Sequence, residues 1–316
     1  MESKTDRDQR IASIDVYRGF AVLWMVITHF LSRVEWTPWF LKNTPDVGFS
    51  PPDLIAPMFI FAMGLTMPIS FKRRKESDGS WRTMLHFLRR SFALIGIGYL
   101  TPWGYDWGLF QTLGAAILVA SIFMHLPGWV RAVSGIALMI GYQYALEHFW
   151  LEDVLHSVWG GIHASLAWAA LLILSTCMAN FILRHRKRQR LLYVIALLVL
   201  VSGIGLTRWF PISMHRVTVS YALIGLGAST LIALFFDDLV EKTEFSFTNL
   251  RAWGANPLLL YVLHYYLWVY VFLFPPSQSW HREAPIWLVS LQGFLFLAAL
   301  TLIARVFHRL RWYLSM

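Results

Sequence analysis

Apolar residues in this chain come in long, almost unbroken blocks separated by short polar stretches. Most blocks are close to the roughly twenty residues that an α-helix needs to cross the hydrocarbon core of a bilayer. The pattern predicts an all-α fold, a polytopic membrane helix bundle of about ten transmembrane helices. The ten blocks lie at residues 11–33, 51–71, 86–103, 108–126, 129–149, 165–184, 190–210, 217–237, 253–274 and 284–307.

The polar stretches between these blocks are too short to hold a soluble domain. We therefore expect residues 1–316 to form a single integral-membrane domain. The third block is the weakest of the ten, because it is short and is interrupted by Gly96, Gly98 and Pro102.

The basic residues predict an orientation. If the N-terminus is cytoplasmic, 21 of the 27 Lys and Arg residues fall on the cytoplasmic side, and Arg18 lies within a block. This bias is the positive-inside pattern, and it predicts that both termini are cytoplasmic. We expect a multi-pass protein of the bacterial inner (plasma) membrane. The basic residues left outside are Arg33, Lys42, Arg208, Arg216 and Arg282.

Composition excludes a soluble protein: 57% of the residues are hydrophobic, 14% are charged, and the mean hydropathy is +0.53. The net charge of +9 follows from the loops that flank the blocks, so we expect contact with membrane lipids and no binding of nucleic acid. The one cysteine, Cys177, provides neither a disulfide framework nor a cysteine metal site.

The first block carries costly polar residues in apolar surroundings. Asp15 and Arg18 are three residues apart, so they share one face of a helix and can pair. His29 lies eleven residues beyond Arg18, which is roughly 16 Å further along a helix. Ionisable groups inside a membrane helix usually serve a function.

Other blocks add candidate residues near their ends. Asp53 follows two prolines at the start of the second block, where it either caps the helix or faces the same outer cavity as His29. Arg89 and Arg90 open the third block. Their basic loop binds lipid phosphates in one reading, and the phosphates of a cytoplasmic nucleotide in the other.

Two further blocks hold polar residues that need partners in a membrane. Gln111 lies just within the fourth block, and the ninth block contains Asn256-Pro257 followed by Tyr261 and His264 on one helical face. Histidine and acidic residues also gather between residues 147 and 163. Their spacing matches no zinc motif, so we expect no metal site.

Six stretches, in order along the chain, together resemble the heparan-α-glucosaminide N-acetyltransferase family. They are ASIDVYRGFAVLWMVITHF, PPDLIAPMFIFAMGLTMPIS, FLRRSFALIGIGYL, GLFQTLGAAILVASI, HRVTVSYALIGLG and WGANPLLLYVLHYY. The first stretch is also similar to the opening helix of bacterial membrane acyltransferases that O-acetylate surface glycans. In the fourth stretch, Thr112 stands where the family has Arg.

The resemblance implies a transmembrane acyltransferase. Acetyl-CoA would be the acyl donor, and the acceptor would be the amine or hydroxyl of a carbohydrate or glycolipid. The donor phosphates would bind near Arg18, Arg89 and Arg90. The oligomeric state is left open, with a homodimer among the options.

One departure from the family changes the expected catalytic residue. The family's catalytic histidine lies in the loop ten residues before the aspartate that matches Asp53, and here that position is Asn43. The O-acetyltransferases carry their essential histidine at the position of His29. We therefore expect His29 to be catalytic, with Asp53 beside it. Residues expected to hold the acceptor or polarise the thioester are Asn43, Gln111, Asn256, Tyr261 and His264.

Two other function classes remain open from the residues. Buried Asp, Arg and His residues also suit a proton-coupled transporter of a small solute, although no inverted repeat relates the two halves of the chain. A non-catalytic scaffold ranks last, because it has no need of costly buried ionisable groups.

Overall fold

The computed structural model describes residues 4–100, 106–157, 159–243, 246–269 and 278–312. These residues form helices and connecting loops, without a β-strand, which confirms the all-α class; an isolated β-bridge joins Val47 and Ser213. The helices are α1 (Lys4–Leu31), η1 (Trp39–Leu41), η2 (Pro51–Leu54), α2 (Ile55–Leu100), α3 (Leu109–Phe123), α4 (Gly128–Ala145), η3 (Leu146–Trp150), α5 (Leu151–Leu155), α6 (Gly161–Arg184), η4 (Arg186–Arg188), α7 (Gln189–Leu206), α8 (Val219–Lys242), α9 (Thr248–Ala255), α10 (Pro257–Trp268), η6 (Gln278–Arg282) and α11 (Ile286–Arg309).

Six helical segments of the described chain are long and apolar enough to cross a membrane, so the expected count of about ten is not supported. The blocks expected at 108–126, 129–149 and 253–274 fall on α3, α4, α9 and α10, which are shorter or more polar. The orientation of the termini stays a prediction. The six segments are Ala12–Leu31, Pro51–Leu100, Gly161–Arg184, Gln189–Leu206, Val219–Lys242 and Ile286–Arg309.

The longest of these segments contains a reversal of the chain. Gly79 lies within α2 at φ 80° and ψ 166°, a backbone conformation that glycine adopts without a steric penalty. The rings of Phe71 and Phe87 have centroids 5.6 Å apart. A continuous helix would separate these residues by roughly 24 Å. The expected blocks 51–71 and 86–103 therefore fall on two helical arms that fold back on each other at Gly79, and residues 101–103 lie outside the described residues.

The chain divides into two compact units, each described by itself. Unit 1 comprises Met1–Asn43, Ser50–Ile55 and Phe235–Ser315, and unit 2 comprises Thr44–Phe49 and Ala56–Leu234. The single domain expected over residues 1–316 stays a prediction.

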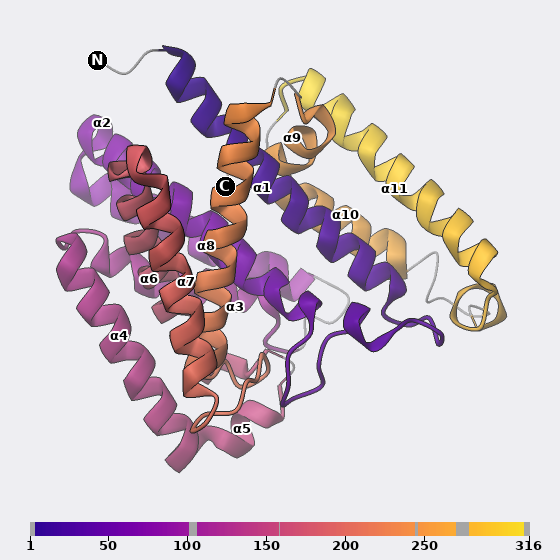
Figure 1. Cartoon of the computed structure of the whole chain (residues 1–316), viewed down its shortest axis with the longest axis horizontal. Coiled ribbons are helices and arrows are strands. Elements are labelled where there is room, and N and C mark those ends of the chain that lie inside the picture. The colour runs from indigo at the N-terminus through magenta and orange to yellow at the C-terminus, as the bar shows by residue number, and fades with distance from the viewer. Residues whose placement is uncertain (1–3, 101–105, 158, 244–245, 270–277, 313–316) are drawn as a thin grey trace. The chain divides into compact units, whose positions relative to one another are not determined.

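Unit 1 is built on a close crossing between α1 and α9. A Cβ atom at Gly19 would overlap with the carbonyl oxygen of Leu250, and one at Gly254 would overlap with the carbonyl oxygen of Asp15. The two backbones therefore approach each other across paired glycines, as small residues allow in helix packing within membranes. Helices α10 and α11 complete this group, with α10 packed on α1 and α11 on α9 (Figure 1).

The boundary between α9 and α10 follows from its sequence. Asn256 leaves the helical conformation at φ −131° and ψ 56°, and Pro257 begins α10. Proline suits the first helical position because its missing N–H would have had no partner there. Two short helices thus replace the single span expected over residues 253–274, the end of which lies outside the described residues.

Unit 2 is organised around α6. The run from Ala167 to Ile173 is buried without a break, so this helix is covered on every side. Helices α3 and α4 both pack on it. A Cβ atom at Gly64 of α2 would come within 3 Å of Ser175, which indicates a close approach of α2 to the same helix.

The glycine crossing in unit 1 gives a testable prediction. Replacing Gly254 by alanine forces a methyl group into the backbone of α1, so we expect the free energy of unfolding to fall by at least about 1–3 kcal/mol. Unfolding in detergent, followed by tryptophan fluorescence, measures the change.

Gly141→Ala is the matched control, because a Cβ atom there meets nothing within 4 Å. We expect this substitution in α4 to be neutral or slightly stabilising, since alanine favours the helix. Equal stabilities of the two variants would contradict the close crossing.

Candidate functional site

Two of the predicted site residues meet in unit 1. Nδ1 of His29, in the last turn of α1, lies 2.9 Å from Nε2 of His264 on α10. The two rings are nearly parallel, with an interplanar angle of 26° and centroids 5.2 Å apart. His264 is fully buried, whereas His29 is partly exposed. A polar pair is thus formed between residues that are 235 positions apart.

The hydrogen bonds assign the protons of this pair. Nδ1 of His264 lies 3.2 Å from the carbonyl oxygen of Leu260, which can only accept, so this nitrogen carries a proton. In a neutral ring, Nε2 of His264 is then an acceptor, and Nδ1–H of His29 donates to it. It follows that Nε2 of neutral His29 holds a lone pair and can accept a proton.

Aromatic side chains surround the pair. The ring of Tyr261 meets His29 edge-on at a centroid distance of 6.4 Å and His264 at 5.2 Å. Trp268 lies 6.3 Å from His29. Tyr261, predicted from its spacing to His264, is therefore brought to the site. An apolar wall of this kind lowers the local dielectric and strengthens the hydrogen bond between the imidazoles.

The turn that carries His29 is held in place by a residue that the sequence analysis missed. His281 is buried, and its Nε2 lies 3.0 Å from the carbonyl oxygen of Phe30, the neighbour of His29. Its Nδ1 lies 3.0 Å from Oε1 of Gln292 on α11. The amide of Gln292 in turn donates to the carbonyl oxygen of Trp280 at 2.7 Å. This chain of bonds ties the end of α1 to α11.

Asp53 is a capping residue and also contacts Asn43. Its Oδ2 accepts hydrogen bonds from the backbone N–H of Ser50 at 2.8 Å and from the Ser50 hydroxyl at 3.1 Å. Its Oδ1 accepts from the side-chain amide of Asn43 at 3.1 Å. The ten-residue spacing between Asn43 and Asp53 thus corresponds to a direct contact. The ring partner of His29 is His264 and not Asp53.

Arg18 lies away from the histidine pair. Its Nη1 is 3.8 Å from Oδ1 of Asp15, as the three-residue spacing predicts. Arg251 and His308 add positive charge around Asp15. Eleven residues of helix place this group roughly 16 Å from His29 along α1.

Asn256 is engaged with the backbone. Its buried side-chain amide donates to the carbonyl oxygen of Trp312 at 2.8 Å. The contact anchors the chain that follows α11 at the junction of α9 and α10.

The remaining predicted site residues lie in unit 2. Arg89 is exposed and Arg90 half-buried on the second arm of α2, where both act electrostatically on His86, as does Arg74 on the first arm. Gln111 is buried, and its amide donates to the carbonyl oxygen of Asp106 at 3.3 Å. Within the described residues, no group of three or more His, Cys, Asp and Glu is placed to hold a metal ion.

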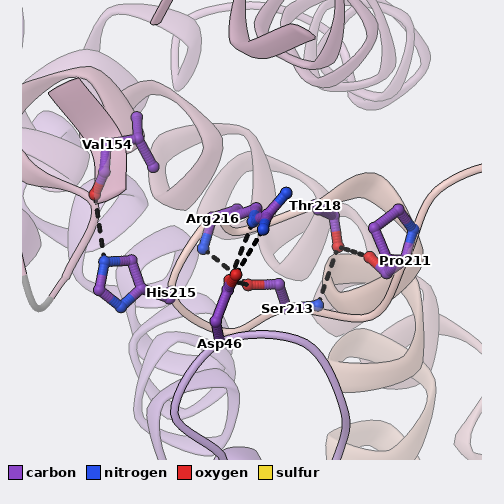
Figure 2. Close-up of polar contacts among 7 residues, drawn as sticks. All are labelled: Asp46, Val154, Pro211, Ser213, His215, Arg216 and Thr218. Carbon is purple, nitrogen blue, oxygen red and sulfur yellow. Dashed lines mark hydrogen bonds and ion pairs between the residues drawn. The ribbon is translucent and has the colours of Figure 1, made fainter. Parts of the chain in front are cut away.

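Unit 2 also contains an ionic clasp that joins two loops (Figure 2). Oδ1 of Asp46 accepts from Nε of Arg216 and from the hydroxyl of Ser213, each at 2.9 Å, and the Nη2 of Arg216 bonds to Oδ2. The backbone N–H of Gly48 donates to the carbonyl oxygen of Ile212 at 2.8 Å beside it. The hydrogen bond from Arg216 holds the pKa of Asp46 below its usual value, and the pKa of Arg216 is raised in turn.

Sequence reasoning treated Arg216 only as an outer basic residue and did not single out Asp46. One sequence feature could have drawn attention to Arg216, because it lies in the stretch HRVTVSYALIGLG that resembles the family. Nothing in the local pattern around Asp46 distinguishes it from a solvated loop aspartate. His281 gave no signal either, since the isolated histidine lies in a short polar stretch.

The family model described as "Heparan-alpha-glucosaminide N-acetyltransferase, catalytic" matches residues 10–171. This range includes His29, Asn43 and Asp53, and it ends before α10 with His264. The chain is also 29% identical over 126 residues to human heparan-alpha-glucosaminide N-acetyltransferase. That alignment covers 36% of this chain and 19% of the human protein, so the chain matches about a fifth of its relative's length.

The clasp predicts a pH dependence of stability. Because the pKa of Asp46 is lower in the folded chain than in the unfolded one, its stabilisation is fully present above the ordinary aspartate pKa of about 3.9 and is lost as the pH falls through the lower folded value. We expect Asp46→Asn to lower the free energy of unfolding by about 0.5–1 kcal/mol at pH 7. Unfolding midpoints between pH 3 and 7 measure the effect.

The difference between Asp46→Asn and the unsubstituted chain should shrink as the pH approaches 3. Glu152→Gln, at an exposed position of α5, is the control and should shift the midpoint little at any pH. A constant difference across the range would contradict an ionic clasp.

Proposed function

Because the chain belongs to the heparan-α-glucosaminide N-acetyltransferase family, we propose that it is a membrane acetyltransferase that uses acetyl-CoA. The acetyl group would pass from cytoplasmic acetyl-CoA to an amine or hydroxyl of an extracytoplasmic sugar or glycolipid. The observation that carries this proposal is the pair formed by His29 and His264, which leaves one basic nitrogen of His29 able to accept a proton.

The acceptor class is carried over from a relative. The name of the human protein describes it as an N-acetyltransferase that acts on a glucosaminide of heparan. The chain matches only about a fifth of that protein, so the amine is one option and a sugar hydroxyl is the other. Both are weak nucleophiles towards a thioester until a base removes a proton.

The proposed step uses the free lone pair of His29. The acceptor nitrogen or oxygen bonds to the thioester carbonyl carbon while its proton moves to Nε2 of His29. The carbon–sulfur bond then breaks, and the proton returns to the leaving thiolate to give the thiol of CoA. The acetyl group is thereby transferred with no net change in protonation of the protein.

His264 supports this step as a positioning residue. It accepts the Nδ1–H of His29, which fixes the orientation and tautomer of the catalytic ring. When Nε2 of His29 gains a proton, the positive charge is shared through the same hydrogen bond. The carbonyl oxygen of Leu260 then faces Nδ1–H of His264 and stabilises that charge.

Asn43 and Asp53 are proposed to bind the acceptor. Asn43 stands at the position of the family's loop histidine, and a carboxamide cannot act as a base near neutral pH. Its contact with Asp53 supports an orienting role for the pair. The loss of a base at position 43 favours His29 as the residue that takes the proton.

Binding of the donor is assigned to basic residues. Arg89 and Arg90 lie beside further positive charge on the arms of α2, which suits phosphate groups. For Arg18, in unit 1, and Gln111, in unit 2, the proposed contacts with the donor or acceptor rest on the sequence resemblance. Asn256 is proposed to keep the α9–α10 junction in shape, given its bond to Trp312.

The location and orientation of the protein are proposed from its apolar helices, its family and its basic residues. Six apolar helices of the described chain and the family identify an integral membrane protein. We propose the bacterial inner membrane with both termini cytoplasmic, from the distribution of basic residues. The family favours acyl transfer over a proton-coupled transporter, and uptake of a solute without acetyl-CoA would be the sign of the latter.

His29→Ala should remove the base. We expect the rate of acetyl transfer, measured as release of free CoA thiol from acetyl-CoA in the presence of glucosamine, to fall by about 100-fold or more. His148→Ala, at an exposed position of η3, is the control and should retain the full rate. Full activity of the His29→Ala protein would overturn the assignment.

Two substitutions of His264 test whether this residue orients the ring of His29 or only fills space beside it. Glutamine offers an oxygen that accepts the Nδ1–H of His29, whereas alanine leaves this proton without a partner. We expect His264→Gln to retain several-fold more activity than His264→Ala, with the difference in kcat rather than in KM. Equal losses in the two variants, at equal thermal stability, would argue against a role through His29.

A further inference from the structure

Arg131 is a buried arginine without a counter-ion. It lies in the first turn of α4 in unit 2, with only 5% of its surface exposed. Its Nη1 contacts the thioether sulfur of Met124 at 3.3 Å, and its Nε has no hydrogen-bond partner in the described chain. No carboxylate of the described residues pairs with it, and the side chains that act on it electrostatically are Cys177 and another arginine, Arg184.

The surroundings add positive charge. A Cβ atom at Gly128 would lie 3.9 Å from Nη2 of Arg131, so the guanidinium folds back over the N-terminus of its own helix. The first N–H groups of α4 lack acceptors within the helix, and Pro127 provides no side-chain cap. This end of a helix carries about half a positive charge. A buried guanidinium placed against it is unfavourable unless an anion binds between them.

The position in unit 2 indicates the kind of anion. Met124 is followed by His125, whose ring lies 4.8 Å from that of Phe71, and Phe71 packs on Phe87. Arg131 therefore lies at the same end of unit 2 as the reversal at Gly79. That end also carries Arg89 and Arg90 near His86, together with Arg74, which pairs with Asp78 at 3.8 Å. Arginines combined with a helix N-terminus match the charge and the hydrogen-bonding geometry of phosphate.

We propose that the N-terminus of α4 and Arg131 form a binding site for a phosphate group, with Arg184 adding charge at its edge. The phosphate belongs either to the headgroup of an anionic lipid or to a water-soluble phosphorylated molecule such as CoA. The site does not depend on acetyl transfer, because it rests on the burial of Arg131 and on its position beside the N-terminus of α4.

The experiment measures binding without turnover. The full chain is placed in nanodiscs of phosphatidylcholine, and its thermal midpoint is followed by tryptophan fluorescence. One arm adds CoA to the buffer, and the other replaces part of the lipid by phosphatidylglycerol. We expect at least one arm to raise the midpoint, and Arg131→Gln to weaken the apparent affinity about 10-fold or more, since charged hydrogen bonds are lost.

The two arms identify the source of the phosphate. A response to CoA alone assigns the site to a soluble molecule, and a response to phosphatidylglycerol alone assigns it to lipid. Lys187→Gln, an exposed position in the loop after α6, removes the same charge nearby and should leave both responses unchanged. An unchanged response in Arg131→Gln, or equal loss in Lys187→Gln, would overturn the proposal.

The single cysteine gives a readout that needs no substitution. Sγ of Cys177 lies 3.5 Å from the carbonyl oxygen of Gly128, beside the proposed site. The ligand that raises the midpoint should slow the reaction of Cys177 with methyl methanethiosulfonate several-fold. Absence of protection together with absence of stabilisation in both arms would show that no phosphate binds. Failure of the His29 variants to alter acetyl transfer would leave this result unaffected.

Discussion

The close crossing of α1 and α9 is the constraint on which unit 1 depends. Gly19 and Gly254 allow each helix to touch the other's backbone, and any side chain at either position would separate them. Helix α10 begins two residues after α9 ends, so the crossing also fixes where α10 runs along α1. The hydrogen bond between His29 and His264 is a consequence of this geometry. The two glycines fix the distance between α1 and α9, and the break at Pro257 directs α10 along α1. The two histidines therefore meet without an unusual local conformation.

Buried polar groups in this apolar chain are arranged mostly in partnered sets. His29 and His264 satisfy each other, His281 joins the end of α1 to Gln292, and Asn256 is bonded to Trp312. An unpaired polar group in an apolar interior costs several kcal/mol, so each pairing also specifies one packing of the helices. Arg131 departs from this arrangement, as do a few other buried polar atoms of the described chain, and its burial beside the N-terminus of α4 is the basis of the proposed phosphate site. The catalytic proposal rests on a different feature, the ring nitrogen of His29 that its hydrogen bonds leave basic.

The two ends of α1 serve different roles in the proposed reaction. Asp15 and Arg18 form an ion pair at the glycine crossing, where Arg18 is proposed to contact the donor or acceptor. His29 lies at the opposite end, beside the aromatic rings of Tyr261 and Trp268. The ten residues between Asn43 and Asp53 span a loop that brings the two side chains into direct contact. Because an amide at position 43 cannot act as a base near neutral pH, the proposed reaction assigns proton transfer to His29.

The sequence by itself determined the helical class, the membrane character and the family. It also marked His29, His264 and Tyr261, because polar residues in long apolar blocks are costly and therefore conspicuous. It predicted about ten crossing helices, whereas six segments of the described chain are candidates by length and composition. Apolarity alone does not reveal that Asn256 and Pro257 divide one block into two helices. Only the tertiary structure decided the pairings. The bond from His29 to His264 and the clasp of Asp46 and Arg216 join residues that are 235 and 170 positions apart, respectively, which no local sequence pattern can predict. The burial of Arg131 likewise depends on how helices distant in the sequence pack around it.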